Sequence, residues 1–345
     1  MGASMVWYSI LSGLVSFVIV LGLVPRWIRI AHSLGLVGKD MNKWGDVRVA
    51  EAGGLWVAIG AVFGLFTLEA LYTYICGCSH YSREVYALTA LLLLATIIGL
   101  LDDILGWKRG LPRWQRVVFM APVALPLVVI KAGVSRMALP FIGVIDLGVF
   151  YPLVAVPIGV LGAANAFNMI AGFNGLEAGM GLLLMAFTAV YAVVKGLELV
   201  FETAIVMLMA LLAFLIYNWY PARIFPGNTL TYAVGAYYAA IVILGNMEKF
   251  GLALFTLYFV KAILNLRGYV RKVWKPGVIE DFGVPRPDGT LDTPVEGIYT
   301  LTHAAIMLLK RVKGSAREPE VVMVILGLQA MIGLVVLWLS LSGLL

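Results

Sequence analysis

The chain has 345 residues, of which 62% are hydrophobic and 13% are charged, and its mean hydropathy is +0.97. Apolar stretches long enough to cross a bilayer recur along the whole sequence, whereas the regular alternation of a membrane β-barrel is absent. Because only helices and closed barrels satisfy their backbone hydrogen bonds in lipid, the expected fold class is an all-α, polytopic membrane protein.

Hydropathy predicts about ten transmembrane helices, which make residues 1–345 a single integral membrane domain. Residues 1–24 have no basic start and no clear cleavage site, so we expect a retained span and not a signal peptide. The predicted spans lie near 4–24, 52–75, 85–101, 115–131, 150–168, 176–195, 199–219, 229–246, 249–270 and 320–344.

Lys and Arg are distributed unevenly between the predicted loops. Most of the 25 follow odd-numbered spans. Because these residues concentrate in cytoplasmic loops, we expect those loops to be cytoplasmic and both termini to lie outside. The net charge of +6 therefore lies beside the membrane, where it favours anionic lipid head groups or phosphorylated substrates over nucleic acid.

The cysteines and histidines give no metal signature. Cys76 and Cys78 are separated by one residue, which makes an unstrained disulfide awkward, so free thiols are expected. His32, His80 and His303 are too scattered to predict a zinc site.

Polar residues gather in the segment 165–179, which joins two apolar runs and contains three Asn, one Glu and three Gly. Asn165 and Asn168 would share one face of a helix, and the glycines let backbone approach a ligand closely. Polar groups at the edge of the hydrocarbon are costly unless something satisfies them. The segment is therefore a candidate site, with hydrogen bonding between helices as the alternative.

Asp102 and Asp103 close the third span on the same predicted side as this cluster. Neighbouring helical residues point about 100° apart, so one carboxylate can face a metal while the other acts as a base or supports it. Carboxylate and amide oxygens suit Mg²⁺, with Mn²⁺ as the alternative ion. The alternative is that Asp102 and Asp103 are simply two solvated charges at the end of a span.

The middle of the predicted spans is nearly apolar. This favours an enzyme site at the membrane surface over a transporter, which would be expected to place polar residues there.

Two further segments complete the predicted cytoplasmic side. Phe225 precedes a Pro-Gly turn and offers a stacking surface for a flat base, although an interfacial aromatic is the alternative. The last loop, 271–318, is the sizeable soluble segment and the predicted substrate-binding loop. Within it, 286–289 fits a type I turn and hence a small hairpin, and 298–312 fits an interfacial amphipathic helix or an ordinary packing helix.

The runs at 99–103, 165–179, 218–221 and 225–229 together resemble the polyprenyl-phosphate N-acetylhexosamine-1-phosphate transferase superfamily. Within it the chain is most similar to the archaeal and eukaryotic branch that acts on UDP-GlcNAc and dolichyl phosphate. The resemblance implies transfer of GlcNAc-1-phosphate to a polyprenyl phosphate, releasing UMP and leaving GlcNAc-diphospho-lipid, with Mg²⁺ as cofactor. With the loop charges placing the site on the cytoplasmic face, the expected location is the plasma membrane of a prokaryote or archaeon. A homodimer is left open.

The resemblance also assigns roles to individual residues, with three departures. The family usually has Asp where this chain has Asn228. Its Lys after the acidic pair aligns near Pro112, and its Arg-His-Arg cluster is missing from 276–285. The implied catalytic residues are Asp102, Asp103 and Asn165; the implied metal ligands are Asn168 and Asn228; the implied uridine-binding residues are Met41, Glu51, Asn174 and Phe225; and the candidates for phosphate or sugar binding are Lys43, Arg109, Arg113, Arg271, Lys272, Lys275 and Arg286.

Two alternatives stay open at this point. The first is the same chemistry with another UDP-N-acetylhexosamine, because the sugar-contacting loop departs most from the family pattern. The second is a transporter for a nucleotide sugar or a lipid.

Overall fold

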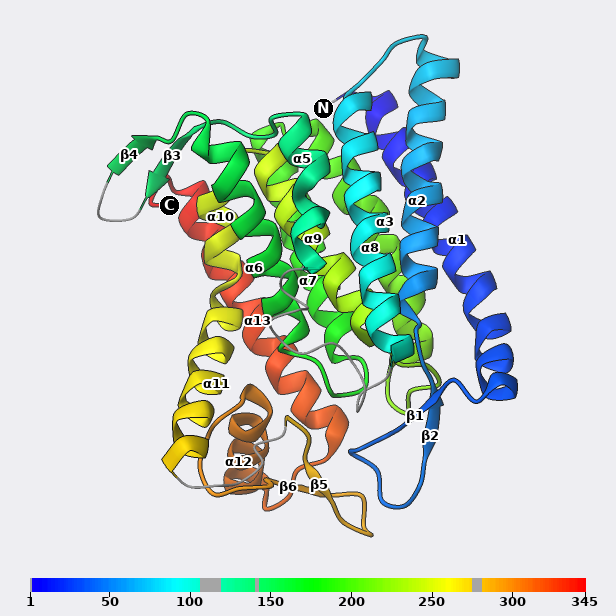
Figure 1. Ribbon diagram of the computed structural model, residues 1–345, viewed down its shortest axis with the longest axis vertical. Helices are drawn as coiled ribbons and strands as arrows, with labels where there is room; N and C mark the ends of the chain where they lie inside the picture. The colour runs from blue at the N-terminus through cyan, green and yellow to red at the C-terminus, as the bar shows by residue number, and fades with distance from the viewer. Residues whose placement is uncertain (1, 106–118, 140–142, 275–280) are drawn as a thin grey trace.

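The computed structural model describes residues 2–105, 119–139, 143–274 and 281–345. Long helices run side by side as a bundle, with short hairpins at its two ends (Figure 1). The long helices are α1 (Ala3–Leu34), α2 (Gly54–Leu71), α3 (Ser82–Leu105), α6 (Val156–Asn168), α7 (Leu176–Lys195), α8 (Glu198–Asn218), α9 (Gly227–Leu244), α11 (Thr256–Trp274), α12 (Leu301–Lys313) and α13 (Glu318–Leu341). The shorter ones are η1 (Tyr72–Cys76), η2 (Ala121–Ala124), α5 (Leu125–Val129), η3 (Tyr151–Ala155) and α10 (Glu248–Leu254).

Helix α9 is the centre of the bundle. It packs against α2, α3, α6, α7, α8 and α10, and all of its residues from 229 to 243 are buried. Small side chains such as Ala233, Gly235 and Ala236 let neighbouring helices come close, which is how helices associate in a membrane. The amino-terminal end of α9 is therefore a fixed point around which other segments can be placed.

The fold class predicted from hydropathy is confirmed. Eight described helices are long and apolar enough to cross a membrane, and the bent pair α10–α11 raises the number to nine. The predicted span 176–195 coincides with α7. The predicted ninth span is not one straight helix, because it breaks between Leu254 and Thr256 with a bend of 54°. The predicted span 115–131 lies partly outside the described residues.

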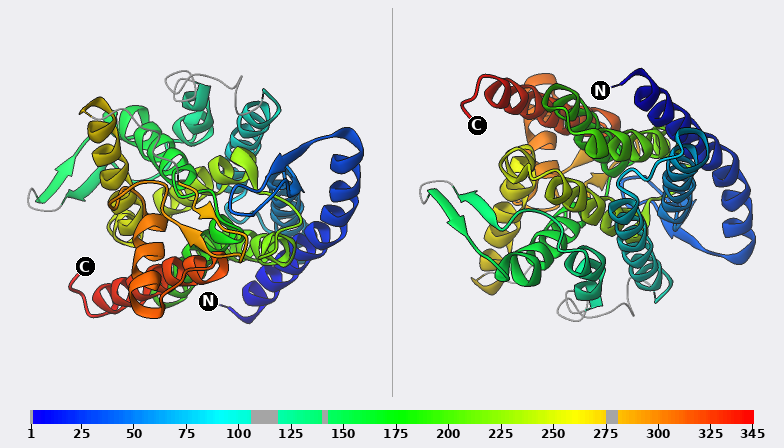
Figure 2. Two further views of the ribbon diagram at one scale, coloured as in Figure 1. Left: turned by 90° about the horizontal axis from the view of Figure 1, so that it is seen from below. Right: turned by 90° about the horizontal axis from the view of Figure 1, so that it is seen from above.

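Segments predicted to be cytoplasmic gather at one end of the bundle. Strands β1 (Val37–Lys39) and β2 (Arg48–Ala50) pair there, as do β5 (Val284–Pro285) and β6 (Leu291–Asp292), close to α12 (Figure 1). Both termini lie toward the opposite end, where β3 (Arg136–Leu139) and β4 (Gly143–Asp146) form a third hairpin that projects from the body (Figure 2). The β1–β2 and β3–β4 hairpins were not anticipated from the sequence.

The predicted hairpin and helix of the last loop are both present. The Gly289 N–H donates to the Arg286 carbonyl over 3.0 Å, closing the turn between β5 and β6. Helix α12 begins at Leu301, three residues later than predicted, and packs against α13; its Ala305 and Ile306 are buried. Val312 remains 78% exposed near its end.

The prediction of free thiols was wrong. Cys76 and Cys78 form a disulfide, with their Cα atoms 5.3 Å apart. That separation lies within the usual range for disulfides. The chain reverses at Gly77, whose φ of +70° lets the two side chains face each other across one residue.

Candidate active site

A cavity of about 470 Å³ lies at the end of the bundle that carries β1–β2 and β5–β6. Segments far apart in the sequence supply its walls: the first loop, the end of α3, the α6–α7 loop, the start of α9 and the last loop. Its lining residues include Lys39, Asp40, Met41, Glu51, Asp102, Asp103, Asn168, Gly172, Asn174, Glu177, Asn218, Phe225, Asn228 and Phe282.

Asp103 fixes the end of α3 against the first turn of α9. Its two carboxylate oxygens accept hydrogen bonds from the backbone N–H of Asn228 at 2.8 Å and of Thr229 at 3.0 Å, and from the Thr229 hydroxyl at 2.5 Å. A carboxylate at this position satisfies N–H groups that have no partner within the helix and also complements the helix dipole. Asp103 thus caps α9 from a neighbouring helix.

Two glycines make this contact sterically feasible. A Cβ added at Gly99 would lie 2.6 Å from the Asn228 carbonyl oxygen and from Thr229 Cα, so α3 reaches α9 only because that side chain is absent. Gly227 has φ of +69°, and a Cβ there would meet an Asp103 oxygen at 2.3 Å. The glycine of the 99–103 motif therefore positions its two aspartates.

Asp102 is held differently from Asp103. It is 3% exposed, and one of its oxygens accepts a hydrogen bond of 2.9 Å from the side-chain NH₂ of Asn228. The side-chain oxygen of Asn168 accepts a hydrogen bond of 2.9 Å from the Thr231 hydroxyl. Asp102, Asn168 and Asn228 all line the cavity together with Asp103, so the structure brings the predicted acidic pair and the predicted ligands into one place.

The donor chemistry of this group fits Mg²⁺. It consists of carboxylate and amide oxygens, which Mg²⁺ prefers, and Mg²⁺ usually completes its shell with water and substrate phosphates. Within the described part of the chain, no three His, Cys, Asp or Glu side chains are placed to hold a metal ion. A site here would therefore depend on the amide oxygens of Asn168 and Asn228 beside Asp102.

The residues predicted to hold a nucleoside line another part of the same cavity. Met41, Glu51, Asn174 and Phe225 all contribute to its surface. Burial raises the pKa of the Glu51 carboxyl, and the negative charge of Asp103 raises it further. The structure thus places a candidate base-binding wall beside the candidate metal site.

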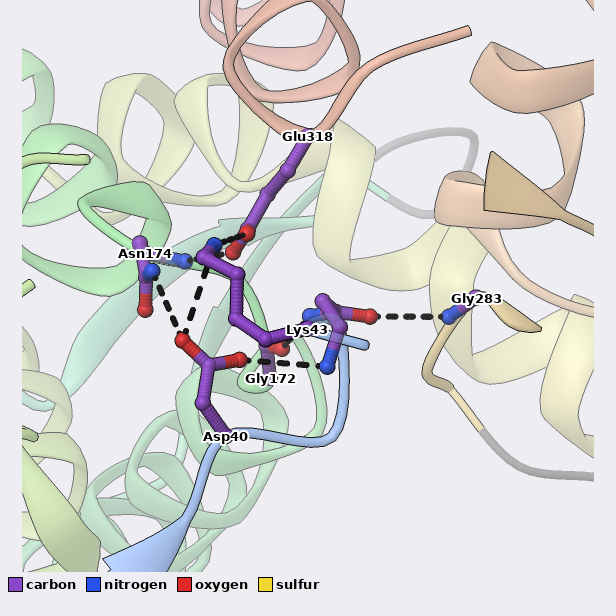
Figure 3. A network of polar contacts seen from close by, with 7 residues as sticks. Asp40, Lys43, Gly172, Asn174, Gly283 and Glu318 are labelled. Atoms are coloured by element: carbon purple, nitrogen blue, oxygen red, sulfur yellow. Dashed lines mark hydrogen bonds and ion pairs between the residues drawn. The ribbon is translucent and has the colours of Figure 1, made fainter. Parts of the chain in front are cut away.

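A polar network, drawn in Figure 3, connects four segments and includes residues that line the cavity. Asn42 donates from its side chain to the Gly172 carbonyl over 2.7 Å, and its side-chain oxygen accepts from the Gly283 N–H at 2.9 Å. Lys43 forms ion pairs with Glu318 and, at 3.6 Å, with Asp40. The first loop is thereby fixed to the α6–α7 loop, the last loop and α13.

The basic residues predicted to bind phosphate or sugar are mostly engaged elsewhere. Arg271 donates to the Glu296 carbonyl at 2.8 Å and Arg286 pairs with Asp292, while Lys43 belongs to the network described above. Arg109, Arg113 and Lys275 lie outside the described residues, as does the side chain of Lys272. Lys39, which was not predicted, is the cation that lines the cavity among the described residues.

One predicted residue lies outside the cavity, and one residue that was not predicted lies in it. Asn165 does not line the cavity, because its side chain donates to the Leu161 carbonyl one turn back at 2.8 Å. Glu177, which sequence reasoning passed over, accepts from the Gly172 N–H at 2.8 Å and shapes the α6–α7 loop. Its position inside the polar segment 165–179 was the available signal.

A bundle of helices that can span a membrane, with carboxylate and amide oxygens gathered in one cavity, defines an integral membrane protein with an enzyme-like site. Residues 85–246 match the family described as glycosyl transferase family 4. A protein of Saccharolobus solfataricus, provisionally named UDP-N-acetylglucosamine–dolichyl-phosphate N-acetylglucosaminephosphotransferase, is 32% identical over 89% of each chain. A Sulfolobus acidocaldarius protein with the same provisional name is 31% identical over 93% of this chain and 92% of its own.

The similarity extends to eukaryotes. The UDP-N-acetylglucosamine–dolichyl-phosphate N-acetylglucosaminephosphotransferase of Dictyostelium discoideum is 25% identical over 76% of this chain and 72% of its own. The chain belongs to glycosyl transferase family 4, the polyprenyl-phosphate sugar-1-phosphate transferases.

Proposed function

We propose that this protein transfers GlcNAc-1-phosphate from UDP-GlcNAc to a polyprenyl phosphate of the dolichyl type, as the first step in assembling a lipid-linked glycan. The observation that carries the proposal is the meeting, in one cavity, of the oxygens of Asp102, Asn168 and Asn228 with the base-binding wall formed by Glu51, Asn174 and Phe225. The names of relatives that match almost the full length of the chain support the same reaction.

In this reaction an oxygen of the lipid phosphate attacks the β-phosphorus of UDP-GlcNAc. The bond from that phosphorus to the bridging oxygen breaks, and UMP leaves with the bridging oxygen. A phosphate monoester has a second pKa of about 6 and is largely ionised at pH 7, so a strong general base is not required. When bound, a Mg²⁺ or Mn²⁺ ion would supply charge neutralisation of the diphosphate.

The residues of the chain contribute mainly position and charge. Asp103 holds α3 on α9, so that Asp102 and Asn228 stay at a fixed place in the cavity. Lys39 presents a positive charge from β1, where it suits a phosphate. Preorganised charges of this kind provide most of the catalysis in phosphoryl transfer.

The distribution of Lys and Arg supports a cytoplasmic site with both termini outside. It can be tested with Asp288→Cys in the β5–β6 turn and Val149→Cys beside η3, both at exposed positions. In intact cells, an impermeant thiol reagent should label position 149, and it should label position 288 only after permeabilisation. Labelling of position 288 in intact cells would reverse the orientation.

The activity itself is tested with purified protein in detergent, given UDP-GlcNAc, Mg²⁺ and a polyprenyl phosphate. We expect release of UMP and formation of a GlcNAc-diphospho-lipid, with both abolished by a chelator. A panel that includes other UDP-N-acetylhexosamines tests the sugar, because the cations that would grip it are the part of the site where this chain departs from its family. Absence of UMP release in detergent, together with uptake of UDP-GlcNAc into vesicles that contain the reconstituted protein, would favour the transporter.

A further inference from the structure

Asn174 is held by two acidic residues from distant parts of the chain. It lies in the α6–α7 loop, is 3% exposed and lines the cavity. Its backbone N–H donates to Glu318 over 2.8 Å, and its side-chain NH₂ donates to Asp40 over 3.0 Å (Figure 3). Both the backbone and the side chain are therefore fixed.

Asp40 is itself held in place. It is 3% exposed, one of its oxygens accepts from the Asn42 N–H at 3.1 Å, and the other lies 3.6 Å from the Lys43 ammonium. Lys43 also pairs with Glu318 and lies 3.9 Å above the ring of Tyr220. These contacts fix the orientation of the Asp40 carboxylate, which accepts the hydrogen bond from the Asn174 side chain.

This arrangement decides which end of the amide faces Asp40. An ionised carboxylate only accepts hydrogen bonds, whereas an amide has one accepting and one donating end. If the Asn174 amide were reversed, its oxygen would lie against a buried carboxylate oxygen with no hydrogen between the two acceptors. The side-chain oxygen of Asn174 is consequently the end that does not face Asp40. No donor within the described residues is hydrogen-bonded to it.

We propose that Asp40 is a positioning residue that makes Asn174 a fixed hydrogen-bond acceptor, and that the site thereby selects uracil over cytosine. The inference rests on the proposed function, which places a uridine nucleotide against this wall. Uracil carries a hydrogen on ring nitrogen N3, which can donate to the Asn174 oxygen. Cytosine has a lone pair at N3, which would face that oxygen without a proton between them.

The test measures binding of UDP, CDP and N3-methyl-UDP to the purified protein by calorimetry. In the wild type we expect CDP and N3-methyl-UDP each to bind at least about tenfold more weakly than UDP, because a buried acceptor loses its donor. In Asp40→Asn, residue 40 can itself donate to the Asn174 oxygen, so the amide can reverse. The CDP-to-UDP ratio of dissociation constants should then fall below about three.

A matched control is Asp46→Asn, the same chemical change in the same loop at an exposed residue that pairs only with Arg48 among the described residues. It should keep the wild-type ratio. A merely structural role for Asp40 would weaken both nucleotides alike and leave the ratio unchanged, and that result would overturn the inference. If Asp40→Asn does not fold, the wild-type comparison decides, because equal binding of UDP and N3-methyl-UDP also overturns it. Absence of UDP binding to the wild type would instead refute the proposed function, and with it this inference.

Discussion

Replacing Asp103 by alanine is expected to lower the thermal stability of the protein and to reduce turnover by at least about a hundredfold. Asp103 accepts three hydrogen bonds from the first turn of α9, and α9 is the central helix of the bundle. Loss of a helix cap costs roughly 1 kcal/mol, and hydrogen bonds to a charged group are stronger than neutral ones, so about 2–4 kcal/mol is expected in total. Thermal unfolding in detergent and UMP release measure the two effects.

Asp103→Asn separates charge from shape. Its single carbonyl oxygen can accept from only part of the α9 turn, so stability should fall between that of the wild type and that of Asp103→Ala. Gly99→Ala is an independent check, because its methyl group would push α3 away from Thr229 while both aspartates remain. An Asp103→Ala protein that unfolds at the wild-type temperature would contradict the capping role.

The sequence predicted well those features that depend on local composition. The boundaries of α7 and the turn at 286–289 follow from apolar run length and from turn chemistry within a few residues. The gathering of the acidic pair with Asn168 and Asn228 followed from two arguments that do not depend on detailed packing. Each residue lies at the end of a predicted span, and the loop charges place those ends on one side.

Features that depend on packing could not be predicted in this way. Lys43 was expected to bind phosphate, yet its partner Glu318 lies 275 residues further along the chain. A single sequence does not show which distant residue will neutralise a cation. The same limit applies to Asn165, whose polarity marked it as a candidate although its amide only bonds back to its own helix at Leu161.

The second large effect concerns Asn228, where the family resemblance leads one to expect Asp. Capping of α9 by this side chain was the simpler alternative, but Asn228 lies inside the helix and its NH₂ donates to Asp102 instead. In Asn228→Asp that donor becomes a carboxylate facing the buried Asp102, and two carboxylates at this distance repel unless a cation lies between them. We therefore expect Asn228→Asp to be less stable than the wild type without Mg²⁺ and to regain stability as Mg²⁺ is added.

Turnover should depend on the oxygen that residue 228 offers to Mg²⁺. Asn228→Asp is expected to be active and to reach half-maximal rate at a lower Mg²⁺ concentration than the wild type, because a charged oxygen binds Mg²⁺ more strongly than an amide oxygen. Asn228→Leu, which has similar size but no oxygen, should lose turnover and show no Mg²⁺-dependent gain in stability. Mg²⁺ titrations of initial rate and of unfolding temperature on the three proteins decide the matter. Three superimposable rate curves that differ only in the yield of folded protein would show that residue 228 is not a ligand, because removal of a ligand must change the metal concentration at which the rate rises.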